Sequence, residues 1–137
     1  MTVAVKICGI NNAAAMQAAV AHGAGFVGLV FYPQSPRSIT PGTAAQLAAL
    51  VPDDVTKVGL FVDPDNVLIA RVLQDVPLDL LQLHGEETPD RCAEIKQRFG
   101  LPVMKVIKVA TLNDVGSAKD YCDVVDWLMF DAKAPSS

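Results

Sequence analysis

Aromatic side chains and charged side chains are both scarce in this sequence. Phe, Trp and Tyr make up 6% of the residues and charged residues 19%, whereas hydrophobic residues make up 51%. The apolar content therefore comes mostly from Ala, Val, Leu and Ile, which is typical of a buried parallel sheet covered by helices. At 137 residues the chain has the length of one ordinary domain. We expect residues 1–137 to form a single domain.

Clustered basic charge is also lacking. The formal net charge is −4 at pH 7 and the basic residues are scattered, which argues against a nucleic-acid partner. Residues 7–36 carry no charge, but polar residues and glycines interrupt them, so we expect no membrane span. The amino terminus has no basic segment followed by a cleavable apolar one, and we expect no signal peptide.

Cysteine is limited to Cys8, Cys92 and Cys122, an odd number without a C-x-x-C pair. This pattern argues against a disulfide framework and against a structural zinc site. It favours a reducing compartment, and we expect a cytoplasmic protein. We expect no metal site.

Short apolar runs with β-strand character recur along the chain, with centres roughly 20 to 30 residues apart, the length of a strand, a helix and two turns. They cover residues 3–8, 26–31, 55–62, 78–84, 103–109 and 126–131. No run pairs with the next as a hairpin. The sequence therefore predicts an α/β protein with a parallel sheet, either open or closed into a barrel.

Helix-start signals lie between the strand runs. Thr40, Asp63 and Thr88 each precede a proline, which is the pattern of an N-cap followed by Pro at the first helical position. Gly100 is placed to end the helix that Thr88 begins. We expect His22 to lie in the last turn of a helix.

Polar residues alternate with apolar ones in two of the strand runs. Lys6 and Cys8 share one face of the first run, and Gln82 and His84 share one face of the fourth. An open sheet with helices on both faces rarely tolerates such residues, whereas the mouth of a barrel does. The pattern favours a barrel.

Candidate site residues gather where strand runs end. Cys8, His84 and Asp131 lie at or just past the carboxyl ends of their runs, and Arg37 follows the second run. In parallel α/β folds, chemistry is placed at this end of the sheet. Free cysteine is usually a buried small hydrophobe, but Lys6 on the same face as Cys8 would favour a thiolate, and the residues leave both roles open.

The other candidates also have structural alternatives. Asp131 could cap a following helix, although the final residues AKAPSS show no helix pattern. His84 could line the barrel with its ring satisfied by backbone, or contact a ligand, and Gln82 is a weaker candidate of the same kind. Arg37 could be a solvated charge. We interpret Asp63 as an N-cap, and Cys92 and Cys122 as structural.

Several short sequence segments together resemble those of phosphoribosylanthranilate isomerase, a (β/α)8 barrel enzyme of tryptophan biosynthesis. The segments are KICGI, GLVFYPQSPRSI, VGLFVDP, LLQLHGEE, VMKVIKV and FDAKAP, in order over essentially the whole chain. The resemblance implies an Amadori rearrangement of N-(5-phosphoribosyl)anthranilate to 1-(2-carboxyphenylamino)-1-deoxyribulose 5-phosphate without a cofactor. It implies that Cys8 is the general base and Asp131 the general acid, and that Arg37 holds the anthranilate carboxylate, with His84 and Gln82 as substrate-binding candidates.

The chain departs from the family pattern in its number of units. We count about six strands and five helices, whereas the barrel needs eight of each, and loops after strands seven and eight usually bind the phosphate. We therefore expect a domain incomplete at its carboxyl terminus, without isomerase activity if the polypeptide ends at Ser137. We expect such a chain to self-associate through open sheet edges.

Three other functions remain open on the sequence alone. They are a non-catalytic barrel fragment that binds through its edges, another phosphosugar-binding barrel enzyme, and an α/β hydrolase with Cys8 as nucleophile and His84 as base.

Overall fold

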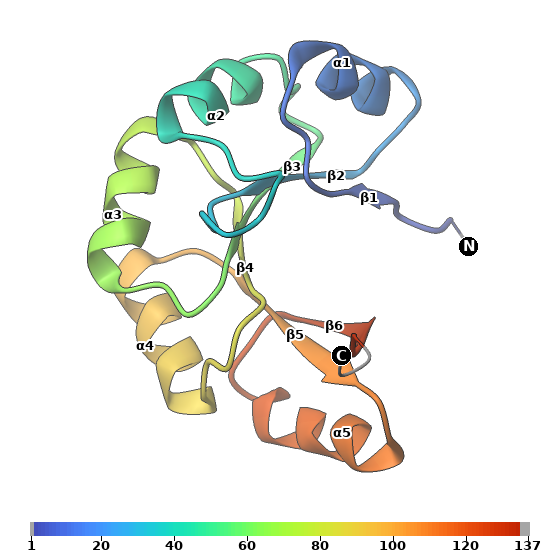
Figure 1. Cartoon of the computed structure of the whole chain (residues 1–137), viewed down its shortest axis with the longest axis vertical. Coiled ribbons are helices and arrows are strands. Elements are labelled where there is room, and N and C mark those ends of the chain that lie inside the picture. Colours follow the sequence, from blue (N-terminus) through green and yellow to red (C-terminus); the bar gives the residue numbers. More distant parts are fainter. Residues whose placement is uncertain (1, 135–137) are drawn as a thin grey trace.

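Strands and helices alternate along the chain, and the helices follow the outer arc of a curved sheet (Figure 1). The computed structural model describes residues 2–134. The strands are β1 (Lys6–Ile7), β2 (Phe26–Val30), β3 (Thr56–Phe61), β4 (Leu80–Leu83), β5 (Val103–Val109) and β6 (Trp127–Ala132). The helices are α1 (Ala13–Ala21), α2 (Pro41–Ala48), α3 (Asn66–Asp75), α4 (Pro89–Phe99), α5 (Leu112–Gly116) and the 3-10 helix η1 (Ser117–Tyr121).

The six strands form one parallel sheet in the order of the sequence, from β1 to β6. Each neighbouring pair is joined by a helical crossover, which is the connection that parallel strands require. The sheet curls so that β1 and β6 approach the same open side of the molecule (Figure 1). The described residues therefore form about three quarters of an eight-stranded barrel wall, confirming the parallel α/β barrel prediction.

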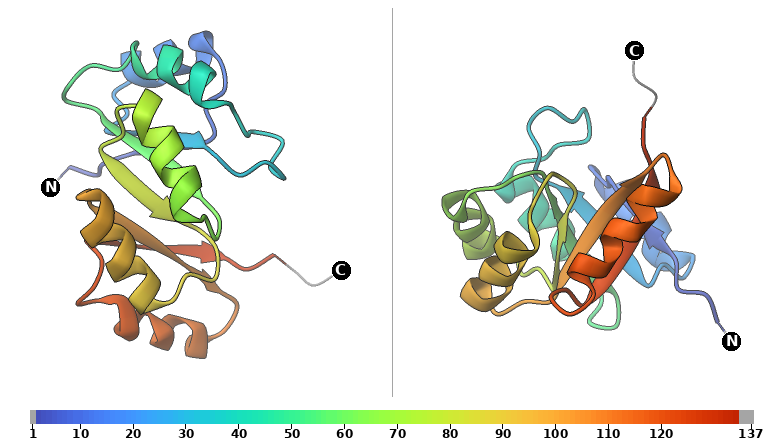
Figure 2. Two further views of the ribbon diagram at one scale, coloured as in Figure 1. Left: turned by 90° about the vertical axis from the view of Figure 1, so that its left-hand side faces the viewer. Right: turned by 90° about the horizontal axis from the view of Figure 1, so that it is seen from below.

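Two hydrophobic clusters lie on opposite faces of the sheet. The larger packs the outer face against the helices and includes Met16, Phe61 and Ile95, each fully buried. Figure 2 shows these helices side by side over that face. The smaller cluster, of Val58, Leu80 and Met104, covers the concave face, with Phe26 and Met129 packed against it. The concave face is thus apolar in its middle and polar toward the carboxyl ends of the strands.

Most expected helix boundaries are confirmed. The Thr40 and Thr88 hydroxyls accept hydrogen bonds from Thr43 and Arg91 amides at the starts of α2 and α4. Gly100 ends α4 in the left-handed conformation, with φ of +66°. The carbonyl of Ala18 accepts the amide of His22, which caps α1.

The N-cap expected at Asp63 is wrong. Asp65 is the N-cap of α3, and its carboxylate accepts a hydrogen bond from the Leu68 amide at 2.7 Å. Asp63 instead adopts a φ of +45° in the loop before the helix. Its carboxylate accepts the amide hydrogen of Glu86, so the side chain joins two loops rather than capping a helix.

Strand ends differ from expectation where a strand has few partners. β5 covers 103–109 as expected, because it pairs with β4 and β6. β1 contains only Lys6 and Ile7 of the expected residues 3–8, since its pairs are limited to Phe26 and Val27 of β2. Residues 135–137 lie outside the described residues. They include the end of the FDAKAP segment and of the AKAPSS segment expected to lack a helix. No helix within 2–134 has both the length and the apolar character needed to cross a bilayer.

Candidate active site at the carboxyl edge of the sheet

Cys8 lies directly after β1, and the neighbouring strand is shaped to receive it. A Cβ atom on Gly28 of β2 would stand 2.9 Å from the Cys8 Sγ and 3.1 Å from its Cα. Only glycine leaves this space free. Cys8 is partly exposed, so the thiol is not the fully buried hydrophobe of the structural alternative.

Arg37 extends from the loop after β2 to the backbone of Cys8. Its Nη1 donates a hydrogen bond to the Cys8 carbonyl oxygen at 3.3 Å. The side chain passes over Gly9, whose φ is +79° and whose Cβ, if present, would stand 2.5 Å from Arg37 Cδ. Arg37 is exposed, but this contact places its guanidinium beside Cys8, with the remaining donors available to a ligand.

His84 joins Asp131 across the mouth of the sheet. The ring Nε2 lies 3.3 Å from Asp131 Oδ2, and the other ring nitrogen lies 3.5 Å from Gln82 Nε2. Burial lowers the pKa of His84 from its ordinary 6.5, while Asp131 opposes the shift and the charge of Lys108 adds to it. Burial therefore disfavours the charged imidazolium form of His84.

Gln82 lies on the concave face of β4 and is 1% exposed. Its Nε2 contacts His84 and lies 3.9 Å from the sulfur of Met129. Its Oε1 is buried and has no hydrogen-bond partner among residues 2–134. A buried acceptor without a hydrogen bond lowers stability. The Gln82 Oε1 is therefore available to accept a hydrogen bond from a ligand in the interior of the barrel.

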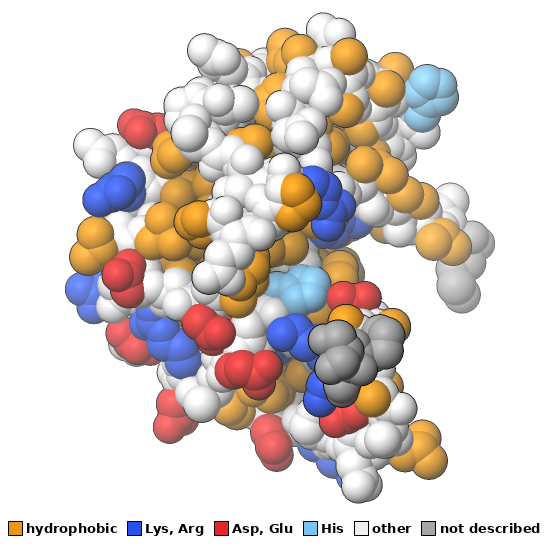
Figure 3. Space-filling model, viewed as in Figure 1, with side chains coloured by type: hydrophobic (Ala, Val, Ile, Leu, Met, Phe, Trp, Pro, Cys, Tyr) orange, Lys and Arg blue, Asp and Glu red, His pale blue; other side chains and the backbone are white. Residues whose placement is uncertain are grey.

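A cavity of about 360 Å³ lies between Arg37 and His84. Arg37, His84 and Lys108 line it together with Val30, Tyr32, Ser35, Leu60 and Val62. In Figure 3 a histidine and basic side chains gather in the hollow of this face. Sequence reasoning missed Lys108. The signal was present, because Lys108 lies at the carboxyl end of a strand run.

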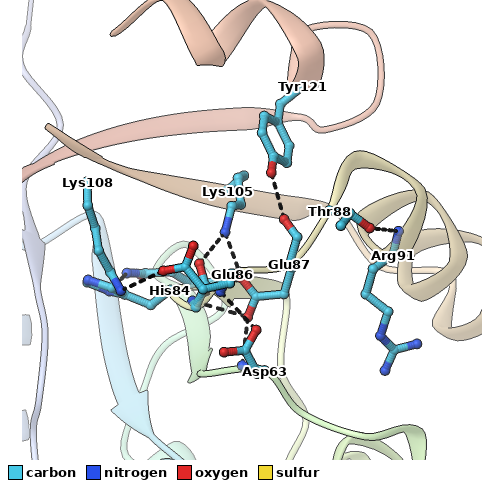
Figure 4. A network of polar contacts seen from close by, with 11 residues as sticks. Asp63, His84, Glu86, Glu87, Thr88, Arg91, Lys105, Lys108 and Tyr121 are labelled. Atoms are coloured by element: carbon cyan, nitrogen blue, oxygen red, sulfur yellow. Dashed lines mark hydrogen bonds and ion pairs between the residues drawn. The ribbon is translucent and has the colours of Figure 1, made fainter. Parts of the chain in front are cut away.

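A buried ion pair supports the loops behind the site (Figure 4). Lys105 Nζ donates to Glu87 Oε1 and to the Gly85 carbonyl, both at 2.7 Å, and the two side chains are 4% and 1% exposed. Glu87 also accepts the amide hydrogens of Asp63 and Gly85. The pair therefore ties the loop after β3 to the loop after β4, which begins at His84.

The remaining cysteines lie away from this edge. Cys92 is buried in α4, where burial raises the pKa of its thiol to about 11, and a structural role fits it. Cys122 is exposed and donates to the Ala118 carbonyl. Within the described part of the chain no contact joins Cys8 to His84 or Asp131, and the partner of His84 is Asp131. The nucleophile and base of a hydrolase are therefore not paired here.

The fold and the position of this cluster define a class of protein, the parallel α/β barrels with a site at the carboxyl edge of the sheet. Comparison with known proteins narrows the class. The sequence model of N-(5'phosphoribosyl)anthranilate (PRA) isomerase matches residues 5–137. The chain belongs to this family.

Curated and solved relatives agree with the family assignment. The chain is 58% identical over 135 residues to the N-(5'-phosphoribosyl)anthranilate isomerase of Paracoccus denitrificans, covering 98% of this chain and 63% of that protein. The crystal structure of the Thermotoga maritima enzyme superposes with a TM-score of 0.90 at 36% identity, over 99% of this chain and 64% of that one.

A further solved phosphoribosyl anthranilate isomerase, also 36% identical, was crystallised with reduced 1-(o-carboxyphenylamino)-1-deoxyribulose 5-phosphate. It gives a TM-score of 0.88 over 96% of this chain and 66% of that one. The chain thus spans about 63% of the length of the curated relatives it matches.

Proposed function

We propose that this chain carries the acid–base and carboxylate-binding part of a phosphoribosylanthranilate isomerase site in tryptophan biosynthesis. The reaction is the Amadori rearrangement of N-(5-phosphoribosyl)anthranilate. The observation that carries the proposal is the contact between Arg37 and the Cys8 backbone, which sets a carboxylate-binding group beside a candidate base. The scheme needs only proton transfers, so we propose no cofactor or metal.

Asp131 is the general acid of the first step in this proposal. Its carboxyl donates a proton to the ribose ring oxygen, the bond from that oxygen to C1 breaks, and the anthranilate nitrogen lone pair forms the C=N bond of a Schiff base. His84, 3.3 Å away, orients the carboxyl.

Cys8 is the general base of the second step. Its thiolate takes the proton from C2, and the electrons of that C–H bond form the C1=C2 bond of an enolamine as the C=N electrons return to nitrogen. Proton shifts then give the C2 ketone of the product. Gly28 supports this role, since its missing side chain leaves room for the Cys8 sulfur.

Arg37 is the anthranilate-binding residue in this proposal. A guanidinium presents paired donors that match a carboxylate in a bidentate way. A family member was crystallised with a reduced carboxyphenylamino sugar, and a ligand of this kind carries the carboxylate that Arg37 would bind. Gln82 and His84 complete the substrate contacts from β4.

For residues 1–137 alone we propose negligible turnover. Barrels of this kind usually bind the substrate phosphate with loops after strands seven and eight, and the described sheet has six strands. We also propose self-association through β1 and β6, whose outer edges are unpaired within residues 2–134. The three free cysteines support a reducing, cytoplasmic compartment.

The test of the proposed function is turnover by a completed chain. Residues 1–137 are joined to the corresponding carboxyl-terminal segment of the Paracoccus denitrificans relative, and conversion of N-(5-phosphoribosyl)anthranilate is measured. We expect turnover by the joined chain and its loss in Asp131→Ala. A folded joined chain that does not convert the substrate would overturn the proposal.

A further inference from the structure

Lys108 lies on the concave face of the sheet, between His84 and Asp131. Met104 on the same strand belongs to the concave cluster, and side chains alternate along β5, so Lys108 faces the same side. In the register of the sheet Lys108 pairs with Asp131 of β6. His84 follows β4 on the other side.

The cavity that Lys108 shares with Arg37 and His84 combines an apolar wall with two cations. Val30, Leu60 and Val62 supply the wall, and the cations come from opposite sides, Arg37 from the loop after β2 and Lys108 from β5. An aromatic ring that carries a carboxylate matches this combination, because the ring can contact the wall while the anion meets the cations.

The charge of Lys108 is only weakly compensated. Glu86 Oε1 lies 3.7 Å from Lys108 Nζ, and the Glu86 side chain is 87% exposed, so water screens the pair. Lys105, on the opposite face of β5, contacts a buried carboxylate at 2.7 Å. Lys105 is therefore committed to its structural partner, whereas the ammonium of Lys108 has donors to give to a ligand.

We propose that Lys108 is a second cationic ligand of the substrate carboxylate, acting with Arg37. This inference rests on the proposed function and deepens it, because it assigns the recognition of the anthranilate ring to a cavity between β2 and β5. A phosphate would meet the same cations, but the apolar wall favours the aromatic carboxylate.

The experiment is a calorimetric titration of the 137-residue chain with anthranilate, with aniline and with inorganic phosphate. We expect Lys108→Met to weaken anthranilate binding about tenfold, the size expected for loss of one charge-assisted hydrogen bond. Lys108→Arg should restore binding to within about threefold. The matched control is Lys119→Met, an exposed lysine of η1 outside the cavity, which should bind as the original chain does.

Comparison of the three ligands shows whether Lys108 binds a carboxylate or a phosphate. Aniline lacks the carboxylate, so Lys108→Met should leave its binding unchanged. A loss of phosphate binding with anthranilate binding unaffected would overturn the carboxylate assignment. Equal anthranilate binding by Lys108→Met and the original chain, or no anthranilate binding by the original chain, would overturn the inference. Turnover by the joined chain tests the proposed function separately.

Discussion

At the residue scale, the position of Cys8 depends on the absence of a side chain at Gly28. An added methyl group would stand 2.9 Å from Cys8 Sγ and 3.1 Å from its Cα, so residue 8 must move. We expect Gly28→Ala to lower kcat of the joined chain by at least about tenfold, because small displacements of a reacting group are costly. Gly42→Ala is the control, since its nearest atom lies at 3.9 Å. Equal kcat values for the two variants would contradict this account of Cys8.

The lowered pKa of His84 predicts a pH dependence of folding. The unfolded chain binds a proton at His84 near pH 6.5, whereas the folded chain binds it only at lower pH. Stability from this residue is therefore fully present above pH 6.5 and is lost as the pH falls toward the folded pKa.

Urea unfolding between pH 8 and pH 5 measures this effect. We expect the free energy of unfolding to fall less steeply with acidification in His84→Asn than in the original chain. His22→Asn is the control, because His22 is exposed at the end of α1, outside the site. Identical slopes for all three proteins would refute the assignment.

At the element scale, the buried pair of Lys105 and Glu87 joins the loops after β3 and β4. Removing one partner leaves the other charge buried, and we expect Lys105→Met to cost about 3 kcal/mol of unfolding free energy. Lys96→Met is the matched control, since it removes a partly exposed pair with Asp126 and should cost no more than about 1 kcal/mol. Urea unfolding at pH 7 measures both, and equal costs would show that the Lys105 pair contributes no more than a surface pair.

The elements that local chemistry specifies were predictable from sequence. Thr40 and Thr88 satisfy helix amides with their own side chains, and β5 is a continuous apolar run paired on both sides. The length of β1 was not predictable, because a strand extends only as far as its partner continues. Asp63 was misassigned since Asp65, two residues later, competes for the same role.

Among the site residues, the sequence predicted Cys8, Arg37, His84 and Asp131 at one edge of the sheet and Gln82 on the same face as His84. The structure brings His84 to Asp131 and Arg37 to Cys8. Their chemical roles stay predictions. Lys105 and Lys108 are three residues apart and so face opposite sides of β5, and sequence alone did not reveal that only Lys105 has a buried partner.

At the scale of the whole molecule, the proposed self-association of residues 1–137 depends on the two edges of the sheet, β1 and β6. Ile7 of β1 is 42% exposed, and Trp127 and Phe130 of β6 are 49% and 53% exposed. Unpaired strand edges with apolar side chains promote association. We expect the average mass of the 137-residue chain in sedimentation equilibrium to rise with concentration above 14.5 kDa.

A substitution at the edge should weaken this association. We expect Ile7→Lys to raise the concentration at which the chain associates by several-fold, because a charge on an edge strand opposes pairing. Val67→Lys is the control, since Val67 is 65% exposed on α3, away from both edges. A constant mass of 14.5 kDa in the original chain over a wide concentration range would contradict association through the edges.

The central claim is that Cys8 moves the C2 proton of the substrate, and it is tested most directly by Cys8→Ala in the joined chain. We expect the variant to bind the reduced product analogue with unchanged affinity while kcat falls by at least about 100-fold, the usual contribution of a general base. Turnover within a few-fold of the unsubstituted joined chain would show that another group takes the proton, and Cys8 would then be a structural thiol.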